Sequence, residues 1–142
     1  MLRGLLTPTN SRLLKPIVTT PVRLFSSTLK KMSQEYTVII YDKPGTDRTK
    51  VRPIHLQDLV GTVNAGVVIA GGALFTDETK TKFVGSTLQI AANSKEEVIE
   101  ALKQDVYYRE GIWDIDSALI YPSGMAVRLP KKLAGTREEL FN

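Results

Sequence analysis

The sequence has 142 residues, of which 42% are hydrophobic, a size that suits one domain with a single buried core. It contains no cysteine, which excludes disulfides, thiolate ligands and cysteine nucleophiles, and its one histidine argues against a transition-metal site. We therefore expect no metal and no cofactor. No apolar run approaches the ~18 residues of a membrane span, so a membrane is not an expected partner either.

Residues 1–32 have the composition of a mitochondrial transit peptide. They hold six of the 19 basic residues and none of the 15 acidic ones, and they are rich in Ser, Thr and Leu. The mitochondrial import machinery recognises such segments as amphipathic leaders. The stretch Arg23-Leu24-Phe25-Ser26-Ser27 resembles a matrix processing site with cleavage near Phe25. We therefore expect a protein of the mitochondrial matrix. A disordered basic tail is the alternative, and translation from Met32 would give a cytosolic form.

The positive charge of the chain belongs to this leader. The whole chain has a net charge of +4, whereas residues 33–142 hold 13 basic and 15 acidic side chains, a net charge of −2. Proteins that bind nucleic acid present a basic stripe to the phosphates, and this balance leaves none on the folded part. Nucleic acid is therefore not an expected partner.

From residue 35 the hydrophobic pattern predicts strands that alternate with helices. Residues 36–41 form a β-branched and aromatic run that is typical of a strand. A helix follows, which begins close to Val51 or Arg52 with Pro53 in its first turn and ends at Gly66. The next two strands are expected over residues 67–70 and 83–90, joined by a polar connection at residues 77–80.

The second half of the chain completes the same order. Ser94 and Glu97 have the spacing of a capping box and open a helix that runs through Leu102. A short irregular or helical piece at residues 105–111 precedes a fourth strand over residues 112–121. The order β-α-β-β-α-β predicts a ferredoxin-like α+β fold, with a four-stranded antiparallel sheet and both helices on one face.

Such a sheet would have a second apolar face. The first strand alternates between two apolar sets, Tyr36, Val38 and Ile40 on one side and Ile39 and Tyr41 on the other. The fourth strand places Ile115, Leu119 and Tyr121 opposite Ala118 and Ile120. Because two helices cover only one face, we expect the other face to meet a second copy of the chain in a homodimer.

Several short motifs, in order, resemble the YCII-related domain family over residues 35–132. They are Arg52-Pro53-Ile54-His55 for its R-x-x-H element, Gly66 to Gly72 for a glycine-flanked strand, Gly85-Ser86-Thr87 for its G-S-T strand, Asp105-Val106-Tyr107 for its D-P-Y element, and Pro130-Lys131-Lys132 after the last strand. Ala73 and Val106 depart from the family pattern, which has proline at or near both places. The resemblance implies a YCII-related domain over residues 33–132 that forms a dimeric α/β barrel, followed by a tail at 133–142. It also implies a histidine and an aspartate as an active site, as in a lyase of chlorinated-aromatic breakdown.

His55 is the residue from which a chemical hypothesis starts. Val51, His55, Leu59 and Val63 recur at i, i+4 spacing on one stripe of the helix, so His55 should point toward the sheet. Imidazole suits proton transfer because its unperturbed pKa, ~6.5, lies near neutral pH. The expected catalytic residues are His55 as general base and Asp105, which would fix its tautomer. The alternatives are a core histidine bonded to a carbonyl, and an aspartate that only caps the next turn.

Three further residues are candidate substrate contacts. Arg52 would hold an anion or stabilise negative charge that develops on a substrate, unless it pairs with Asp42 or Asp58 at the surface. Gly72 would let the backbone approach a ligand, and Ser86 would offer a hydroxyl group.

Two functions remain open from the sequence. One is a small enzyme that performs proton abstraction or lyase-type elimination on a small anionic organic molecule. The other is a non-catalytic dimeric module of the same fold that binds a metabolite or another protein through the same cleft.

Overall fold

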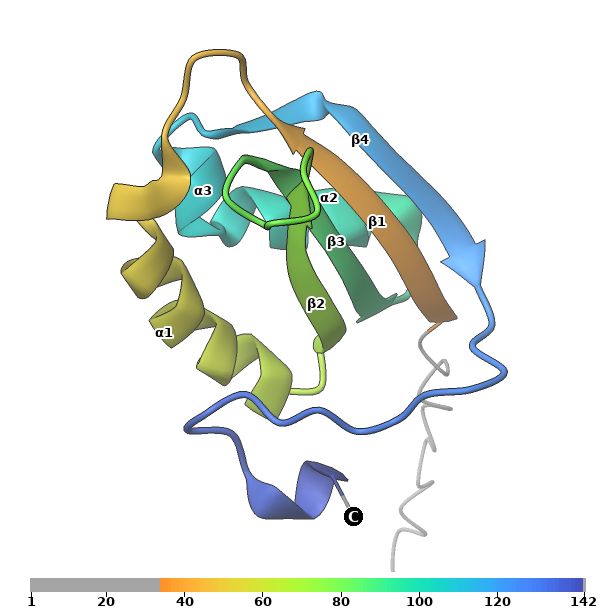
Figure 1. The fold of residues 1–142 in the computed structure, drawn as a ribbon. Coiled ribbons are helices and arrows are strands. Elements are labelled where there is room, and N and C mark those ends of the chain that lie inside the picture. The colour runs from red at the N-terminus through yellow and green to blue at the C-terminus, as the bar shows by residue number, and fades with distance from the viewer. Residues whose placement is uncertain (1–33, 142) are drawn as a thin grey trace, which may run out of the picture.

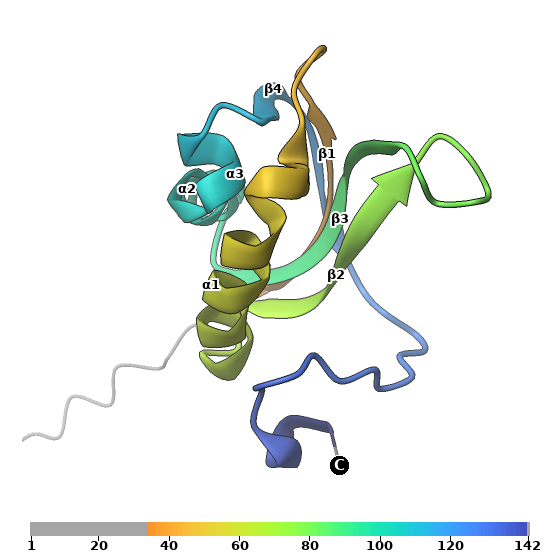
Figure 2. The ribbon, with the colours of Figure 1, turned by 60° about the vertical axis from the view of Figure 1, so that its left-hand side comes forward.

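The computed structural model describes residues 34–141, and the expected leader with its cleavage site lies outside them. Four antiparallel strands pair in the order β2-β3-β1-β4, namely β1 (Gln34–Asp42), β2 (Val68–Phe75), β3 (Phe83–Ala92) and β4 (Trp113–Ser123). Three helices, α1 (Arg52–Asn64), α2 (Lys95–Gln104) and the one-turn α3 (Val106–Arg109), lie on one side of this sheet (Figures 1 and 2). The arrangement is the ferredoxin-like α+β fold that the sequence predicts.

Helix α1 begins and ends where the sequence predicts. Val51 is its N-cap residue, and Pro53 lies in the first turn, where a missing N–H costs no helical hydrogen bond. The chain leaves the helix at Gly66, whose φ of 72° is a left-handed conformation that glycine adopts without steric cost. His55 is the buried residue of this helix, as its position on the apolar stripe predicts.

Side chains fix the start of helix α2 and the junction that follows its last residue. The Ser94 hydroxyl accepts a hydrogen bond from the Glu97 N–H at 3.3 Å, and the Glu97 carboxylate accepts one from the Asn93 N–H at 2.6 Å. At the other end Asp105 separates α2 from α3, and its carboxylate accepts the N–H of Tyr107 at 2.8 Å. The junction of the two helices therefore places Asp105 at a defined point beside α1.

The hydrophobic core fills the space between the sheet and the helices. Its largest fully buried side chains come from both layers and include Trp113, Tyr107, Ile40, Ile90 and Leu102. Burying a side chain of this size contributes about 1.5–3 kcal/mol.

No helix of the described part of the chain covers the opposite face of the sheet (Figure 2). Tyr41, Leu119 and Tyr121 are 41%, 43% and 59% exposed there. The predicted alternation of β4 is wrong at Ile115, which packs against the core and does not share a face with Leu119. The cause is a bulge, because the register of β4 against β1 shifts between Ile39 and Tyr41.

The C-terminal segment, residues 124–141, crosses the end of the molecule where α1 stops and β2 starts (Figure 1). It finishes in a 3-10 turn, η2 (Glu138–Phe141). Arg128 pairs with Glu35 at 2.6 Å, while Arg137 donates its backbone N–H and a guanidinium N–H to Asn64 at 2.9 and 2.6 Å. The segment is thereby attached to the start of β1 and to the last residue of α1.

Candidate active site

A cavity of about 310 Å³ lies between α1 and β2, within the usual size of small-molecule sites. It extends along the whole of α1, from Arg52 in the first turn to Val63 near the end. Arg52, His55, Gly72 and Ser86 all line it, so the structure gathers four of the five predicted site residues around one space.

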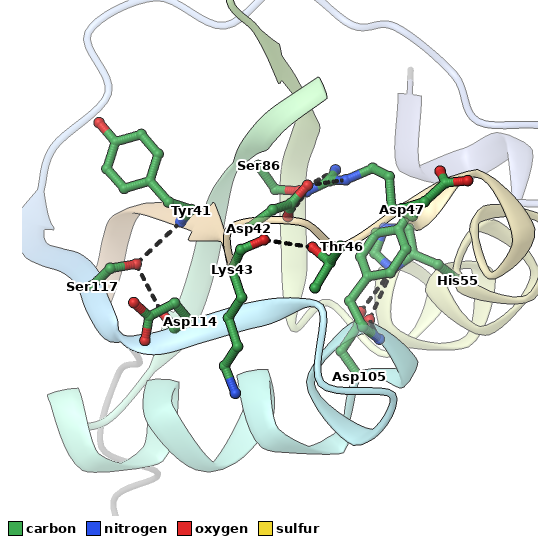
Figure 3. Close-up of polar contacts among 12 residues, drawn as sticks. Tyr41, Asp42, Lys43, Thr46, Asp47, His55, Ser86, Asp105, Asp114 and Ser117 are labelled. Carbon is green, nitrogen blue, oxygen red and sulfur yellow. Dashed lines mark hydrogen bonds and ion pairs between the residues drawn. The ribbon is translucent and has the colours of Figure 1, made fainter. Parts of the chain in front are cut away.

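His55 has a carboxylate partner. Its Nδ1 lies 2.9 Å from the side chain of Asp105, and Figure 3 shows the two side chains pointing toward each other. The imidazole is 8% exposed, stacks on Tyr107 with ring centroids 4.1 Å apart, and meets the edge of Trp113 at 5.9 Å. A carboxylate at Nδ1 keeps the proton of a neutral imidazole on that atom, which leaves Nε2 as the basic nitrogen.

Asp105 reaches His55 from outside the cavity. It lines a separate space of about 70 Å³ next to Trp113, and not the larger cavity. The bond from the Tyr107 N–H holds its carboxylate in place, even though Val106 replaces the proline of the family pattern. Asp105 therefore contacts the imidazole and not the space for a ligand. Asp105 also caps α3, as one of the two predicted alternatives has it, while it bonds to His55.

Arg48 is a site residue that the sequence pattern does not single out. It lies in the 3-10 turn η1 (Arg48–Lys50), is 2% exposed and lines the cavity. Its guanidinium forms an ion pair with Asp42, with Nε 2.7 Å from Oδ2, and donates to the Ser86 hydroxyl at 3.0 Å. The same group lies 4.7 Å from the centre of the Tyr107 ring. Arg48 precedes the periodic part of α1, so helical spacing gives no signal for its burial.

Arg52 is available to a ligand. Its two predicted surface partners are engaged elsewhere, since Asp42 binds Arg48 and Asp58 lies 3.5 Å from Arg109. Within residues 34–141 no carboxylate oxygen lies within 4 Å of the Arg52 guanidinium. The first turn of α1 has neither an acidic residue nor a side-chain cap, so the helix dipole also favours an anion at this point.

All charged side chains in the described wall of the cavity are basic. They are Arg48, Arg52 and Lys131, of which Arg48 is neutralised by Asp42. Burial raises the pKa of Tyr107 above its usual value, an effect that the charges of Arg48 and Arg52 partly oppose. The Tyr107 hydroxyl is therefore protonated at neutral pH. A wall of this charge favours a negatively charged ligand.

Two glycines of the sheet differ in what surrounds them. Gly72 lines the cavity with its backbone, and a Cβ there would meet no atom within 4 Å. Because Gly72 pairs with Thr87, that Cβ would project from the uncovered face of the sheet and not into the cavity. A Cβ at Gly85 would overlap the carbonyl oxygen of Ile40 and lie 3.1 Å from the Cα of Tyr41. Gly72 therefore tolerates a side chain, whereas Gly85 is required for the pairing of β1 with β3.

Comparison with known proteins gives consistent matches. A sequence model of the YCII-related domain family matches residues 34–117. Aspercryptin biosynthesis cluster protein B of Emericella nidulans is 33% identical over 107 residues, which are 70% of this chain and 69% of that protein. Fusaric acid biosynthesis protein 2 of Gibberella fujikuroi is 34% identical over 95 residues, which are 63% of this chain and 91% of that protein.

A solved structure shares the fold. It is the 5-chloro-2-hydroxyhydroquinone dehydrochlorinase of Burkholderia phenoliruptrix AC1100 in complex with 2,5-dihydroxybenzoquinone. The similarity has a TM-score of 0.51 at 19% sequence identity and covers 63% of this chain and 93% of that chain. At this identity the likeness concerns the fold alone.

Proposed function

Because the chain belongs to the YCII-related domain family, we propose that it is an enzyme that abstracts a proton from a small anionic organic molecule. His55 is the catalytic base, Asp105 positions it, and Arg52 contacts the anionic group, while Gly72 and Ser86 form the wall that faces the substrate. One observation carries this proposal. The Nδ1 of His55 lies 2.9 Å from a carboxylate, beside a cavity whose charged wall residues are all basic.

The reaction follows from these roles. Nε2 of His55 takes a proton from a carbon next to a carbonyl group, and the electron pair of the broken C–H bond moves into that carbonyl as an enolate. Arg52 stabilises the negative charge on the oxygen, and Asp105 stabilises the imidazolium. Where the substrate carries a leaving group on the adjacent carbon, the enolate expels it as an anion, which is the lyase-type outcome.

The names of the similar proteins support small-molecule chemistry. Two of them are named for the biosynthesis of aspercryptin and of fusaric acid, and the structural neighbour is named as a dehydrochlorinase. They favour an enzyme over a protein that only binds.

A non-catalytic binding module is the second candidate. The observation that favours it is the packing of His55, whose ring is almost fully buried against Tyr107, Trp113 and Asp105. A histidine enclosed in this way can also be a structural residue.

Proton exchange separates the two candidates. We would incubate the protein in D2O with 5-chloro-2-hydroxyhydroquinone and with a panel of small 2-oxo acids, and follow deuterium incorporation and chloride release by NMR and ion chromatography. The His55→Gln variant should lose activity by at least about 100-fold, the usual contribution of a general base. Asp105→Asn should show a smaller loss, and Arg52→Gln should raise KM more than it lowers kcat.

Asp58→Asn is the matched control for Asp105→Asn, because it makes the same change on an exposed residue of α1. It should retain the activity of the wild type. Undiminished turnover in His55→Gln would contradict the proposed role of the histidine. Binding by calorimetry without turnover of any compound would favour the non-catalytic module.

A further inference from the structure

The C-terminal segment supplies part of the wall of the His55 cavity. Lys131, Leu133 and Phe141 line it together with α1 and β2. The same three residues also line a second space of about 560 Å³, together with Ile69, Ala70 and Gly71. The two spaces therefore adjoin at the C-terminal segment.

This segment is held against the domain close to the cavity. Arg137 donates its backbone N–H to the side chain of Asn64 in α1 at 2.9 Å, and a Cβ at Gly135 would lie 3.5 Å from the side chain of Val60. Most of the segment is exposed, whereas Leu133 and Phe141 are partly buried. An exposed chain with two apolar side chains turned inward is a wall of the cavity rather than a loose end.

Leu133 and Phe141 lie outside the residues that the family model matches. The family match ends at residue 117, and only Pro130-Lys131-Lys132 of the segment resembles family sequences. The apolar contacts of the segment therefore lie outside the residues that the family model matches.

The polar and apolar walls of the cavity are separated along α1. Arg52 and His55 lie in its first turn, and Leu59 and Val63 follow one and two turns later. At a rise of 1.5 Å per residue, Arg52 and Val63 are about 16 Å apart along the helix axis. The bonds of Arg137 to Asn64, the last residue of α1, place the C-terminal segment at the apolar end of the cavity.

We propose that the C-terminal segment makes the site selective for amphipathic anions, in which a carboxylate or similar group carries an apolar chain or ring. This inference rests on the proposed function, because it takes Arg52 as the contact of the anionic group. Leu133 and Phe141 contact the apolar part of the ligand and determine how large that part is. The substrate class is thereby narrowed from small anions in general to anions with a hydrophobic body.

A homologous series of carboxylates tests this proposal. Acetate, butyrate, hexanoate and octanoate are titrated into the full chain, and binding is read from the NMR signal of His55, the one histidine of the sequence. Kd should fall by up to about fourfold for each added methylene group, the value expected for complete burial, until the cavity is filled. The Leu133→Ala/Phe141→Ala variant should flatten this dependence and leave the affinity for acetate unchanged.

Val127→Ala is the matched control on the same segment. Val127 is 75% exposed and lines neither space, so this variant should show the chain-length dependence of the wild type. Adipate provides a second control, because its far end is charged. Adipate that binds more tightly than hexanoate would mean that Lys131 recognises the far end, which overturns the proposed apolar contact.

The remaining outcomes distinguish this inference from the proposed function. Equal affinity for all four carboxylates, or an unchanged dependence in the double variant, would overturn the role of the segment and leave the proposed function standing. A His55 signal that no carboxylate moves would overturn the anion site itself, and both proposals with it.

Discussion

Gly85 lies in β3 against the backbone of β1, where the two strands form part of the sheet that supports the site. A methyl group at this position would overlap the Ile40 carbonyl oxygen, and the paired strand cannot move away without losing its register. We expect Gly85→Ala to lower the free energy of unfolding by about 3 kcal/mol, at the upper end of the usual cost of overpacking. Urea denaturation followed by circular dichroism measures this change.

Gly72→Ala is the matched substitution for that prediction. Its methyl group would meet no atom within 4 Å and would project from the uncovered face of the sheet, so the free energy of unfolding should change by less than about 1 kcal/mol. Equal losses of stability in the two variants would contradict the account of Gly85 as a packing constraint.

At the scale of single residues, the sequence predicts the inward direction of His55 because its helical neighbours are apolar at i, i+4 spacing. Spacing along the chain does not predict the partner of His55, because Asp105 is 50 positions away. Only the resemblance to a family suggests this pair. Arg48 gives no periodic signal because it lies in an isolated turn before the helix. The sequence does not predict that Leu133 and Phe141 line the cavity either, because the irregular segment that carries them has no repeating pattern.

At the scale of elements, one carboxylate organises the connection between β2 and β3. Asp77 accepts hydrogen bonds from the N–H groups of Thr81 and Lys82 at 3.0 and 2.7 Å and from the hydroxyl of Thr79. These bonds, that of the Thr79 hydroxyl foremost, lower the pKa of Asp77 to about 2. The carboxylate thereby satisfies backbone N–H groups of this turn, as an N-cap side chain does at the start of a helix.

The lowered pKa gives the connection a defined pH dependence. An unfolded aspartate titrates near ~3.9, so the contribution of Asp77 to stability is complete above that pH and is lost as pH falls through about 2. An NMR titration of the Asp77 carboxyl carbon should have its midpoint near 2, and exchange of the Thr81 and Lys82 amides should accelerate in the same interval. The Asp77→Asn variant should lack this dependence. A midpoint near the unfolded value would show that the hydrogen bonds do not persist in solution.

The boundaries of the helices are well predicted because specific residues mark them. Pro53 and Gly66 enclose α1, and Ser94 with Glu97 opens α2. The length of β2 is less predictable, because residues 71–75 pair with β3 although two glycines interrupt the apolar run. Backbone hydrogen bonds to β3 extend β2 through these residues, and their side chains give no sign of this extension. The bulge in β4 depends on the same kind of long-range pairing.

At the scale of the whole molecule, the uncovered face of the sheet leads us to propose a homodimer. Tyr41, Leu119 and Tyr121 lie on it and are all substantially exposed. Light scattering coupled to size exclusion should give about twice the 15.7 kDa mass of one chain. Leu119→Arg should convert the protein to a monomer, because a charge buried in an apolar interface without a partner is costly.

Ile54→Arg is the control for that experiment. Ile54 is an exposed apolar residue of α1, on the layer of helices rather than on the open face. This variant should remain a dimer. Loss of the dimer in both variants would place the interface elsewhere, and a monomeric wild type would contradict the proposal directly.

One part of the cavity wall belongs to the packed core, and the other part belongs to an exposed segment. This difference affects how the ligand preference of the site can change between related proteins. Residues of α1 and β2 that line the cavity also hold the core together, so mutations there carry a cost in folding. Leu133 and Phe141 belong to a peripheral stretch, where replacements are tolerated more readily. Relatives that keep the histidine, its aspartate and the sheet can thus change their ligand preference through a few substitutions in this exposed segment.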